Sequence, residues 1–298
     1  MKVFLICSLL IASMAAFSET PQETYMSGGS GVGFGNGGVA SDELDLSLME
    51  VNPALLAKKR AYIFSGALTS PDRGRSFYDV GVLDSHTSDL AIGIKGRDFA
   101  SEQKEGEEPT LFSPVKRRFA ASFARKLSSF YAGLTLNYAQ SEIIENKKRF
   151  EVEVYSLGVG LYGEFENGFS FGVSWQNLQN RGYDQVSPYT FRAGVSYTPI
   201  EPLLISLDYV SYEDSAYYEG NKGEMHGFVG PAFKYRVFGG FNLVGSAKAG
   251  VSGSKFRRLS GGVSYSYESL SLSYYMMTSE YESEYTSTAS LSYTARSF

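Results

Sequence analysis

The feature that most constrains this chain is a repeat of alternating hydrophobicity that runs from residue 57 to residue 298. Each unit is about ten residues long and is closed by a turn. One unit places polar Ser206 and Asp208 between the apolar residues Leu203, Ile205, Leu207 and Tyr209. Because alternate residues of a strand point to opposite faces, each unit predicts a strand with one apolar and one polar face. A series of such strands is typical of a membrane β-barrel with lipid outside and a polar lumen inside.

The repeat divides into about fourteen strands, which is an even number, as bacterial outer-membrane barrels require. We expect them at 57–68, 75–84, 88–97, 115–126, 129–141, 149–163, 168–177, 189–198, 202–212, 225–237, 240–251, 257–267, 269–278 and 285–298. The connections alternate between long charged segments, such as 98–114 and 213–224, and short turns, such as 127–128 and 238–239. The sequence therefore predicts an all-β fold, an antiparallel transmembrane β-barrel with its long loops outside the cell.

Composition agrees with a sheet-rich membrane protein that does not bind nucleic acid. The chain has 22 Tyr, 21 Phe and 32 Gly among 298 residues, which favours strands and tight turns over helices. Mean hydropathy is −0.17, as expected when every second strand residue faces water. The net charge of −5 is mild, and it argues against a nucleic-acid partner.

Residues 1–18 have the features of a cleaved secretory signal peptide. Lys2 is followed by an apolar run that begins at Val3, and small residues flank Phe17 near the expected cleavage site. A membrane anchor is the alternative, but the run is shorter than the roughly 18 residues that a spanning helix needs. We expect export to the outer membrane of a bacterial cell. Cys7, the only cysteine, lies in this leader, so we expect no disulfide in the mature protein.

Residues 19–56 differ from the repeat and are expected to form a small hatch, or plug. Residues 27–38 are rich in glycine, and residues 42–49 are acidic with regularly spaced leucines. A short helix capped by Ser41 or Asp42 is predicted there, ended by Asn52-Pro53. This segment is too small to form a core of its own. We therefore expect it inside the barrel formed by residues 57–298.

The hatch motif Asn52-Pro53-Ala54, after the glycine-rich stretch, resembles the N-terminal hatch of FadL-type outer-membrane transporters of long-chain fatty acids and other hydrophobic compounds. A second stretch, from Trp175 through 188–194 to 204–209, is similar to the PorV branch of that superfamily, which serves in protein secretion. The resemblance implies a plugged barrel that passes a hydrophobic ligand. In physical terms the residue before a proline is held extended, and the motif is interpreted either as a structural anchor or as a ligand contact.

Basic residues on the polar face of the strands are candidate lumen cations: Lys95, Arg192, Lys234, Arg236 and Lys248. The candidate hatch acids are Asp42, Glu43, Asp45 and Glu50. One interpretation is salt bridging that docks the plug to the wall. The other is a basic lumen that attracts an acidic headgroup. The two are compatible.

Enzyme chemistry finds little support in the sequence. The two histidines, His86 and His226, fall in an inner turn and beside an outer loop, and neither has the spacing of a metal-ligand pair. The glycine pattern 31–36 lacks the preceding strand of a phosphate loop. We expect no enzyme activity, no cofactor and no metal.

Two functions remain open from the sequence. The first is passage of a hydrophobic or amphipathic small molecule, for example a long-chain fatty acid, across the outer membrane. The second is a PorV-like barrel that docks secretion-system proteins and transports nothing. The expected partners are outer-membrane lipid, together with a hydrophobic ligand in the first case and secretion proteins in the second.

Overall fold

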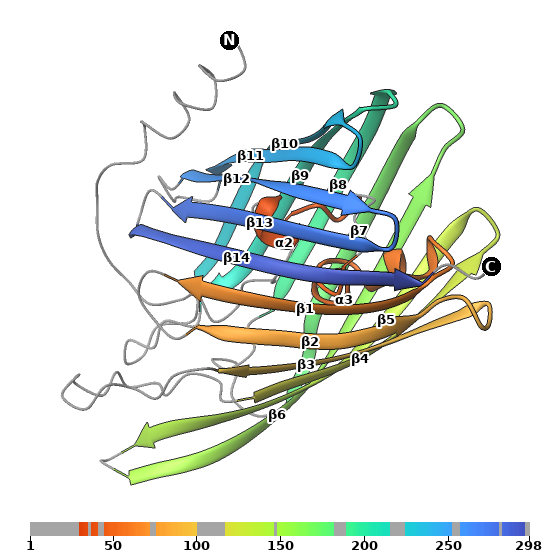
Figure 1. The fold of residues 1–298 in the computed structure, drawn as a ribbon. Helices are drawn as coiled ribbons and strands as arrows, with labels where there is room; N and C mark the ends of the chain where they lie inside the picture. Colours follow the sequence, from red (N-terminus) through yellow and green to blue (C-terminus); the bar gives the residue numbers. More distant parts are fainter. Residues whose placement is uncertain are drawn as a thin grey trace.

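The computed structural model is a closed barrel of fourteen antiparallel strands (Figure 1). The structure describes residues 30–34, 37–40, 45–71, 76–99, 117–145, 148–181, 189–214, 224–251, 257–279 and 282–295. The strands are β1 (Tyr62–Pro71), β2 (Phe77–Asp84), β3 (Leu90–Phe99), β4 (Arg117–Leu127), β5 (Phe130–Glu145), β6 (Lys148–Glu164), β7 (Phe169–Arg181), β8 (Thr190–Ile200), β9 (Leu203–Asp214), β10 (Glu224–Phe238), β11 (Phe241–Gly250), β12 (Arg257–Tyr267), β13 (Leu270–Ser279) and β14 (Glu282–Ala295).

Every strand pairs with its neighbours in the chain, and β1 closes the barrel by pairing with β14 from Tyr62 opposite Ala295 to Pro71 opposite Thr286. The predicted fold class and strand number are confirmed. The predicted start of the first strand at residue 57 is wrong. Residues 53–57 form a short 3-10 helix, because Pro53 fixes a helical φ at its first position. The predicted signal peptide and the last residues, 296–298, lie outside the described residues.

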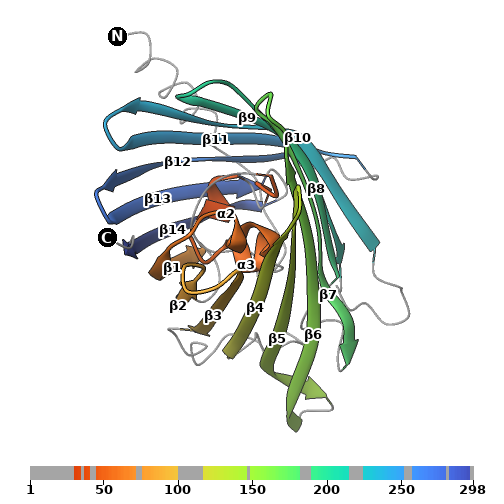
Figure 2. The ribbon, with the colours of Figure 1, turned by 90° about the vertical axis from the view of Figure 1, so that its right-hand side faces the viewer.

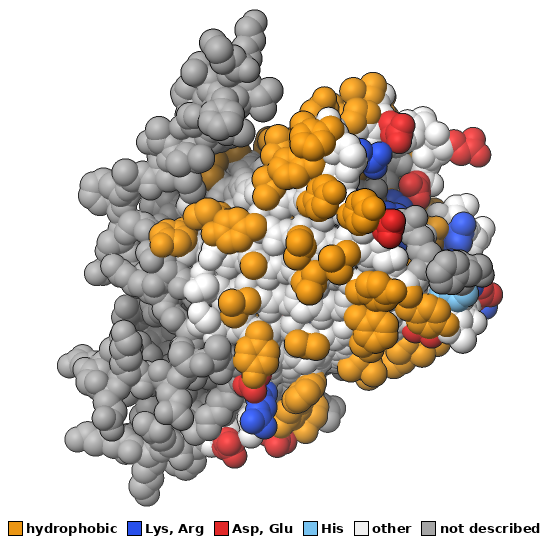
Figure 3. All heavy atoms as spheres, in the orientation of Figure 1, with side chains coloured by type: hydrophobic (Ala, Val, Ile, Leu, Met, Phe, Trp, Pro, Cys, Tyr) orange, Lys and Arg blue, Asp and Glu red, His pale blue; other side chains and the backbone are white. Residues whose placement is uncertain are grey.

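Side chains alternate between an exposed outer face and a buried inner face, as the repeat predicted. On β9, Ile205 and Leu207 are 43% and 51% exposed, whereas Ser206 and Asp208 between them are buried. Apolar side chains are spread over the outer surface in Figure 3. An apolar outer face costs nothing in lipid but would be unfavourable in water, so this pattern fits a membrane-spanning barrel.

Tight turns close the end of the barrel opposite the long connections. Four of them use a residue with positive φ: Ser128 at 57°, Gly168 at 81°, Gly239 at 50° and Glu268 at 50°. Large aromatic and apolar side chains stay exposed next to these turns, among them Phe130, Phe165, Phe169, Tyr197, Phe238 and Tyr267. Aromatic girdles of this kind mark the membrane–water boundary of outer-membrane barrels.

The inner segment, the described residues among 30–57, lies within the ring of strands (Figure 2). It contains α2 (Ser30–Gly33), α3 (Leu48–Val51) and the 3-10 helix η2 (Pro53–Ala57). The predicted helix ends at Asn52 as expected, but α3 begins only at Leu48, after Ser47. The expected caps, Ser41 and Asp42, lie outside the described residues. Among the described residues, no helix is long and apolar enough to cross a membrane.

Candidate functional site: the inner segment and its docking wall

The inner segment is anchored to the barrel by an apolar cluster at the end with the short turns. Leu46, Leu48, Met49, Leu55 and Leu56 of the inner segment pack against inward-facing wall residues. These wall residues are Ala61, Ile63, Leu83, Ala91, Ala120, Ala124, Tyr131 and Tyr162. The inner face is therefore apolar around this cluster, in contrast to the predicted polar lumen face.

Asn52 of the hatch motif is fully buried and bonds in three directions. Its Nδ2 donates to the carbonyl oxygens of Val39, at 2.9 Å, and of Leu161 on β6, at 3.0 Å. Its Oδ1 accepts a hydrogen bond from the Ala54 amide at 3.1 Å, which caps η2 before Pro53. Asn52 therefore joins two parts of the inner segment to the wall, and Pro53 and Ala54 are buried beside it.

Glycines on β5 to β7 let the backbone of the inner segment approach the wall closely. A Cβ at Gly160 would lie 2.1 Å from Asn52 Oδ1, and one at Gly133 would lie 2.4 Å from the Ala54 nitrogen. A Cβ at Gly172 would lie 2.1 Å from the Val39 carbonyl oxygen. Gly133 and Gly160 are directly opposite each other in the sheet. Only glycine leaves room for this contact.

Hydroxyl groups of the wall donate to carbonyl oxygens of the inner segment. Ser174 Oγ bonds the Val51 carbonyl at 2.5 Å, and Ser196 Oγ bonds the Ala40 carbonyl at 2.9 Å. Thr135 Oγ1 donates to the Met49 carbonyl at 3.2 Å. These bonds satisfy carbonyl groups of the inner segment that would otherwise be buried without a partner.

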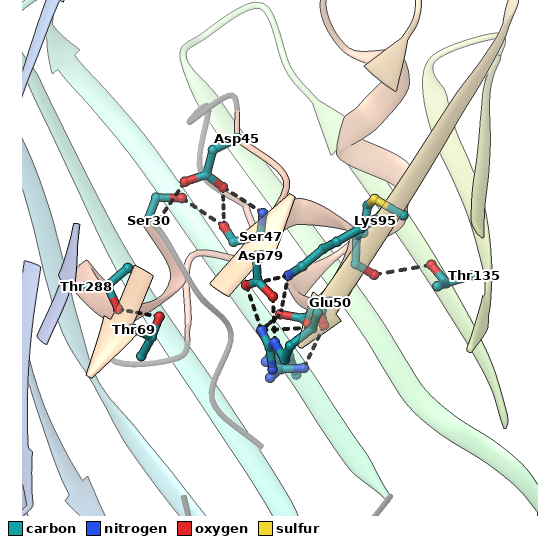
Figure 4. A network of polar contacts seen from close by, with 12 residues as sticks. Ser30, Asp45, Ser47, Glu50, Thr69, Asp79, Lys95, Thr135 and Thr288 are labelled. Carbon is teal, nitrogen blue, oxygen red and sulfur yellow. Dashed lines mark hydrogen bonds and ion pairs between the residues drawn. The ribbon is translucent and has the colours of Figure 1, made fainter. Parts of the chain in front are cut away.

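Glu50 of α3 lies in a buried ion-pair network with β2 and β3 (Figure 4). Lys95 Nζ is 3.1 Å from Glu50 Oε2 and 3.1 Å from Asp79 Oδ2. Arg97 places Nη2 3.2 Å from Glu50 Oε1 and Nε 2.6 Å from Asp79 Oδ1. The Arg97 guanidinium also lies over the ring of Phe77, 4.2 Å from its centroid.

The charge of Glu50 is stabilised by this surrounding. Burial acts to raise the pKa of the Glu50 carboxyl, but attraction to Arg97 and Lys95 outweighs it and leaves the pKa below its ordinary value of 4.5. The stabilisation from the ionised carboxylate is therefore fully present above pH 4.5 and is lost as the pH falls through the lowered value.

The other predicted cations lie at different places in the lumen. Arg192 is buried, and its Nη1 donates to the Glu50 carbonyl oxygen at 3.1 Å. Lys248 is buried beside Asp208, with the Gly37 backbone against both. Lys234 has the inward parity and is half-buried. Arg236 is exposed and pairs with Glu201 at 3.3 Å, beyond the inner segment, because it lies next to a turn.

The predicted acids are only partly described. Asp42 and Glu43 lie outside the described residues. Asp45 accepts hydrogen bonds from the Ser30 amide at 2.6 Å and the Ser47 amide at 2.8 Å, so it joins α2 to the turn before α3. Sequence reasoning missed Asp79 and Arg97. Arg97 lies two residues after Lys95 on the same strand, so both side chains point to the same face. This spacing could have identified Arg97 as a lumen cation.

We call β2 to β8 the docking wall, and β11 to β14 with β1 the hydroxyl wall. In the hydroxyl wall, hydroxyl groups of neighbouring strands bond to one another: Ser65 with Ser292, Thr69 with Thr288, Ser246 with Ser260, and Ser273 with Ser290. Helix α2 packs there through Val32 and Phe34 against Tyr275 and Met277. Ser260 Oγ also donates to the Gly33 carbonyl at 2.8 Å.

A cavity of about 10 Å³ lies between the inner segment and the wall. Polar groups of Asp45, Ser47, Asp79 and Lys95 line part of it. This volume holds about one water molecule and no hydrocarbon ligand. Among the described residues, no group of three or more His, Cys, Asp or Glu side chains is placed to hold a metal ion.

The sequence matches no protein-family profile and no curated protein. Solved structures share the fold. The toluene transporter TbuX of Ralstonia pickettii is 14% identical, with 91% of this chain and 99% of that chain covered and a TM-score of 0.63. The toluene transporter TodX of P. putida is 10% identical, with 92% and 100% covered and a TM-score of 0.64.

A FadL homologue of Pseudomonas aeruginosa is also similar. It is 11% identical, with 94% of this chain and 99% of that chain covered and a TM-score of 0.60. At these identities the likeness concerns the fold. The fold of this chain is that of the FadL-type outer-membrane barrels, as the hatch motif led us to expect.

Proposed function

We propose that this protein is an outer-membrane transporter that passes hydrophobic or amphipathic small molecules. The observation that carries this proposal is the way the lumen is closed. The inner segment contributes no strand to the sheet within the described residues, and it is held by side-chain contacts and hydrogen bonds that can break and re-form. The fold shared with two toluene transporters supports the same function.

In this proposal residues 1–18 are a leader, residues 19–56 are a hatch and residues 57–298 are the barrel. Asn52-Pro53-Ala54 is the anchor about which the hatch moves, because Asn52 is bonded to β6 and Pro53 begins η2. The apolar cluster that surrounds Leu55 and Leu56 holds the same end of the hatch. Outer-membrane lipid surrounds the barrel, and the ligand is a hydrophobic small molecule.

The second candidate is a barrel that docks secretion-system proteins and transports nothing. The small cavity beside α3 favours it, since about 10 Å³ among the described residues holds no hydrocarbon ligand. The two functions differ in whether the inner segment has to move. A hatch that opens must leave the wall, whereas a permanent plug stays.

A reversible lock on the hatch tests the proposal. A Cβ at Gly93 would lie 3.2 Å from the Met49 sulfur, so Met49→Cys with Gly93→Cys places two thiols across the contact. Uptake of radiolabelled toluene by intact cells expressing this variant should stop after treatment with a short thiol cross-linker and return on reduction.

The matched control is Thr69→Cys with Thr288→Cys, which joins two neighbouring strands of the wall. Cross-linking this pair should leave uptake unchanged. Transport through a moving hatch is contradicted if the Met49–Gly93 lock leaves toluene uptake at its starting rate. No uptake by any form, together with secretion proteins that co-purify with the barrel, would support the docking function.

A further inference from the structure

Arg125 of β4 is a charged residue on the outer face of the docking wall, near the tight turns. The inner face of β4 carries Ser122 and Ala124, which are 0% and 2% exposed. Arg125 has the opposite parity and is exposed, two residues before Leu127, which is 53% exposed at the end of the strand. Because alternate residues of a strand point to opposite faces, Arg125 lies on the face that contacts lipid.

The neighbours of Arg125 on this face are apolar. Leu90 of β3 and Ala132 of β5 are directly opposite it in the sheet. Phe130 and Leu134 flank Ala132 on the same face of β5, and they are 49% and 37% exposed. A small side chain thus stands next to Arg125, between two large apolar ones.

Arg125 has no carboxylate partner among the described residues. The acid that precedes β3, Asp89, pairs with Arg60 instead. The next basic residue of β4, Lys126, belongs to the inner face, and its Nζ lies 5.6 Å from the centre of the Tyr131 ring. The charge of Arg125 is therefore available to an anion that comes from outside the chain.

Arg125 lies at the depth of the membrane boundary. The strand ends two residues later at Leu127, and Phe130 begins the next strand. The Phe130 ring lies 6.0 Å from the ring of Phe171, which lies 5.9 Å from that of Phe165. Aromatic residues of this kind mark the boundary of the hydrocarbon region. A long basic side chain at this depth places its charge among the lipid headgroups while its stem stays in the apolar region.

We propose that Arg125 binds the phosphate group of a phospholipid, with the acyl chains along the outer face of β3 to β5. A guanidinium group presents paired donors that match phosphate oxygens. Ile92 and Leu134 are exposed one step closer to the membrane centre and match an acyl chain. With the long connections outside the cell, this lipid belongs to the periplasmic leaflet. The inference holds for both candidate functions, because it concerns the outer face and needs no movement of the inner segment.

Native mass spectrometry of the purified full chain, released from detergent micelles, tests this site. Dioctanoylphosphatidylglycerol and dioctanoylglycerol serve as probes, because they share their acyl chains and differ in the phosphate group. Arg125→Gln should lower the apparent affinity for one phosphatidylglycerol molecule about tenfold, which corresponds to about 1.4 kcal/mol. Binding of dioctanoylglycerol should be weak and equal in the two forms.

Arg117→Gln is the matched control. Arg117 begins the same strand, its side chain is 61% exposed, and its Nε lies 3.8 Å from Asp98 Oδ2 at the opposite end of the barrel. This variant loses the same charge and should bind phosphatidylglycerol as the native chain does. Equal affinity of the native chain and Arg125→Gln, or an equal loss in Arg117→Gln, would overturn the site.

Inorganic phosphate separates a lipid headgroup from a free anion. A large excess of inorganic phosphate should displace no phosphatidylglycerol, because the acyl chains contribute to binding of the lipid. Displacement to the level of Arg125→Gln would show that the site takes free phosphate, and the proposal of a lipid site would be wrong.

Discussion

The docking wall presents charges, glycines and hydroxyl donors to the inner segment, whereas the hydroxyl wall presents side chains that are already paired across strands. Asn52 and Glu50 of the inner segment bind the docking wall. The glycines at the close backbone contact, Gly133 and Gly160, also belong to this wall. On the second side Thr69 bonds Thr288 and Ser65 bonds Ser292, with or without the inner segment. A buried polar group is costly only when its partner is missing. The buried cations of the docking wall have a partner in the inner segment, whereas the hydroxyl pairs of the hydroxyl wall do not need one.

The two walls differ in the contacts that are lost when the inner segment moves away. If α2 leaves the hydroxyl wall, apolar contacts of Val32 and Phe34 and the bond from Ser260 are lost, but few polar groups are left without a partner. If α3 leaves the docking wall, Lys95 and Arg97 lose a carboxylate. We therefore expect α2 to leave its wall first and α3 to follow, with Asn52 as the anchor.

The largest effect is expected where charge is buried in the docking wall. Arg97→Met leaves two carboxylates, Asp79 and Glu50, with Lys95 as the remaining cation in contact. Breaking a buried ion pair costs about 3–5 kcal/mol. Urea-induced unfolding in lipid vesicles should show this loss. Arg236→Met removes an exposed pair with Glu201 and should cost about 0–1 kcal/mol. Equal losses would contradict the dependence of this wall on its buried charges.

The cost of placing a charge on the outer face should depend on its depth in the membrane. It should not depend on whether the strand belongs to the docking wall or to the hydroxyl wall. Leu207→Arg places a charge on an exposed mid-strand position of β9, and Ile200→Arg places one at the end of β8. The cost is about 2–4 kcal/mol at the bilayer midplane and about 0–1 kcal/mol near its surface. The same unfolding measurement compares them. A larger loss for Ile200→Arg would show that the outer face is assigned to the wrong depth.

The close approach of the inner segment's backbone to glycines of the barrel should matter at the docking wall and not at the hydroxyl wall. Gly160→Ala adds a Cβ about where Asn52 Oδ1 lies, so the inner segment must shift. Overpacking of this kind costs roughly 1–3 kcal/mol, and cleavage of the inner segment by an added protease should become faster. Gly66→Ala meets its nearest atom, the Asp79 carbonyl oxygen, at 3.7 Å and should change nothing. Unchanged cleavage of both variants would show that the close contact at Gly160 does not hold the inner segment.

The smallest net effect is expected in the hydroxyl wall. Thr69→Val alone leaves the Thr288 hydroxyl buried without its partner, which costs about 1–3 kcal/mol. Thr69→Val together with Thr288→Val removes both groups and should return stability close to that of the native chain. A double variant that is less stable than the single one would show that these hydroxyl groups have other partners.

The sequence predicted the barrel well because its signal is present in every strand. The period of two persists from β1 to β14, and for β12 the predicted range 257–267 coincides with the observed one. It failed at residues 57–61, because the apolar run 54–57 after Pro53 belongs to η2 and three basic residues separate it from β1, which begins at Tyr62. A local pattern of apolar residues does not distinguish a short helix against the wall from the first turn of a strand.

The candidate site was predictable in part. Glu50, Lys95 and Arg192 were singled out from parity and charge, and the structure brings these three together. The pairing of Asp79 with Arg97 depends on the register of β2 against β3, which the sequence does not state. The importance of Gly160 depends on the position of Asn52, more than a hundred residues earlier in the chain. Such contacts arise only when the barrel closes.

Closure of the lumen by the inner segment, as proposed above, can be tested by deletion. Deletion of residues 28–50 removes α2 and most of α3 and keeps Asn52 and η2 on the wall. The strands close on one another, so the barrel should still fold, which far-UV circular dichroism verifies. Single-channel conductance in planar bilayers should then rise well above that of the full chain. A deletion variant that folds and conducts no better than the full chain would contradict the hatch.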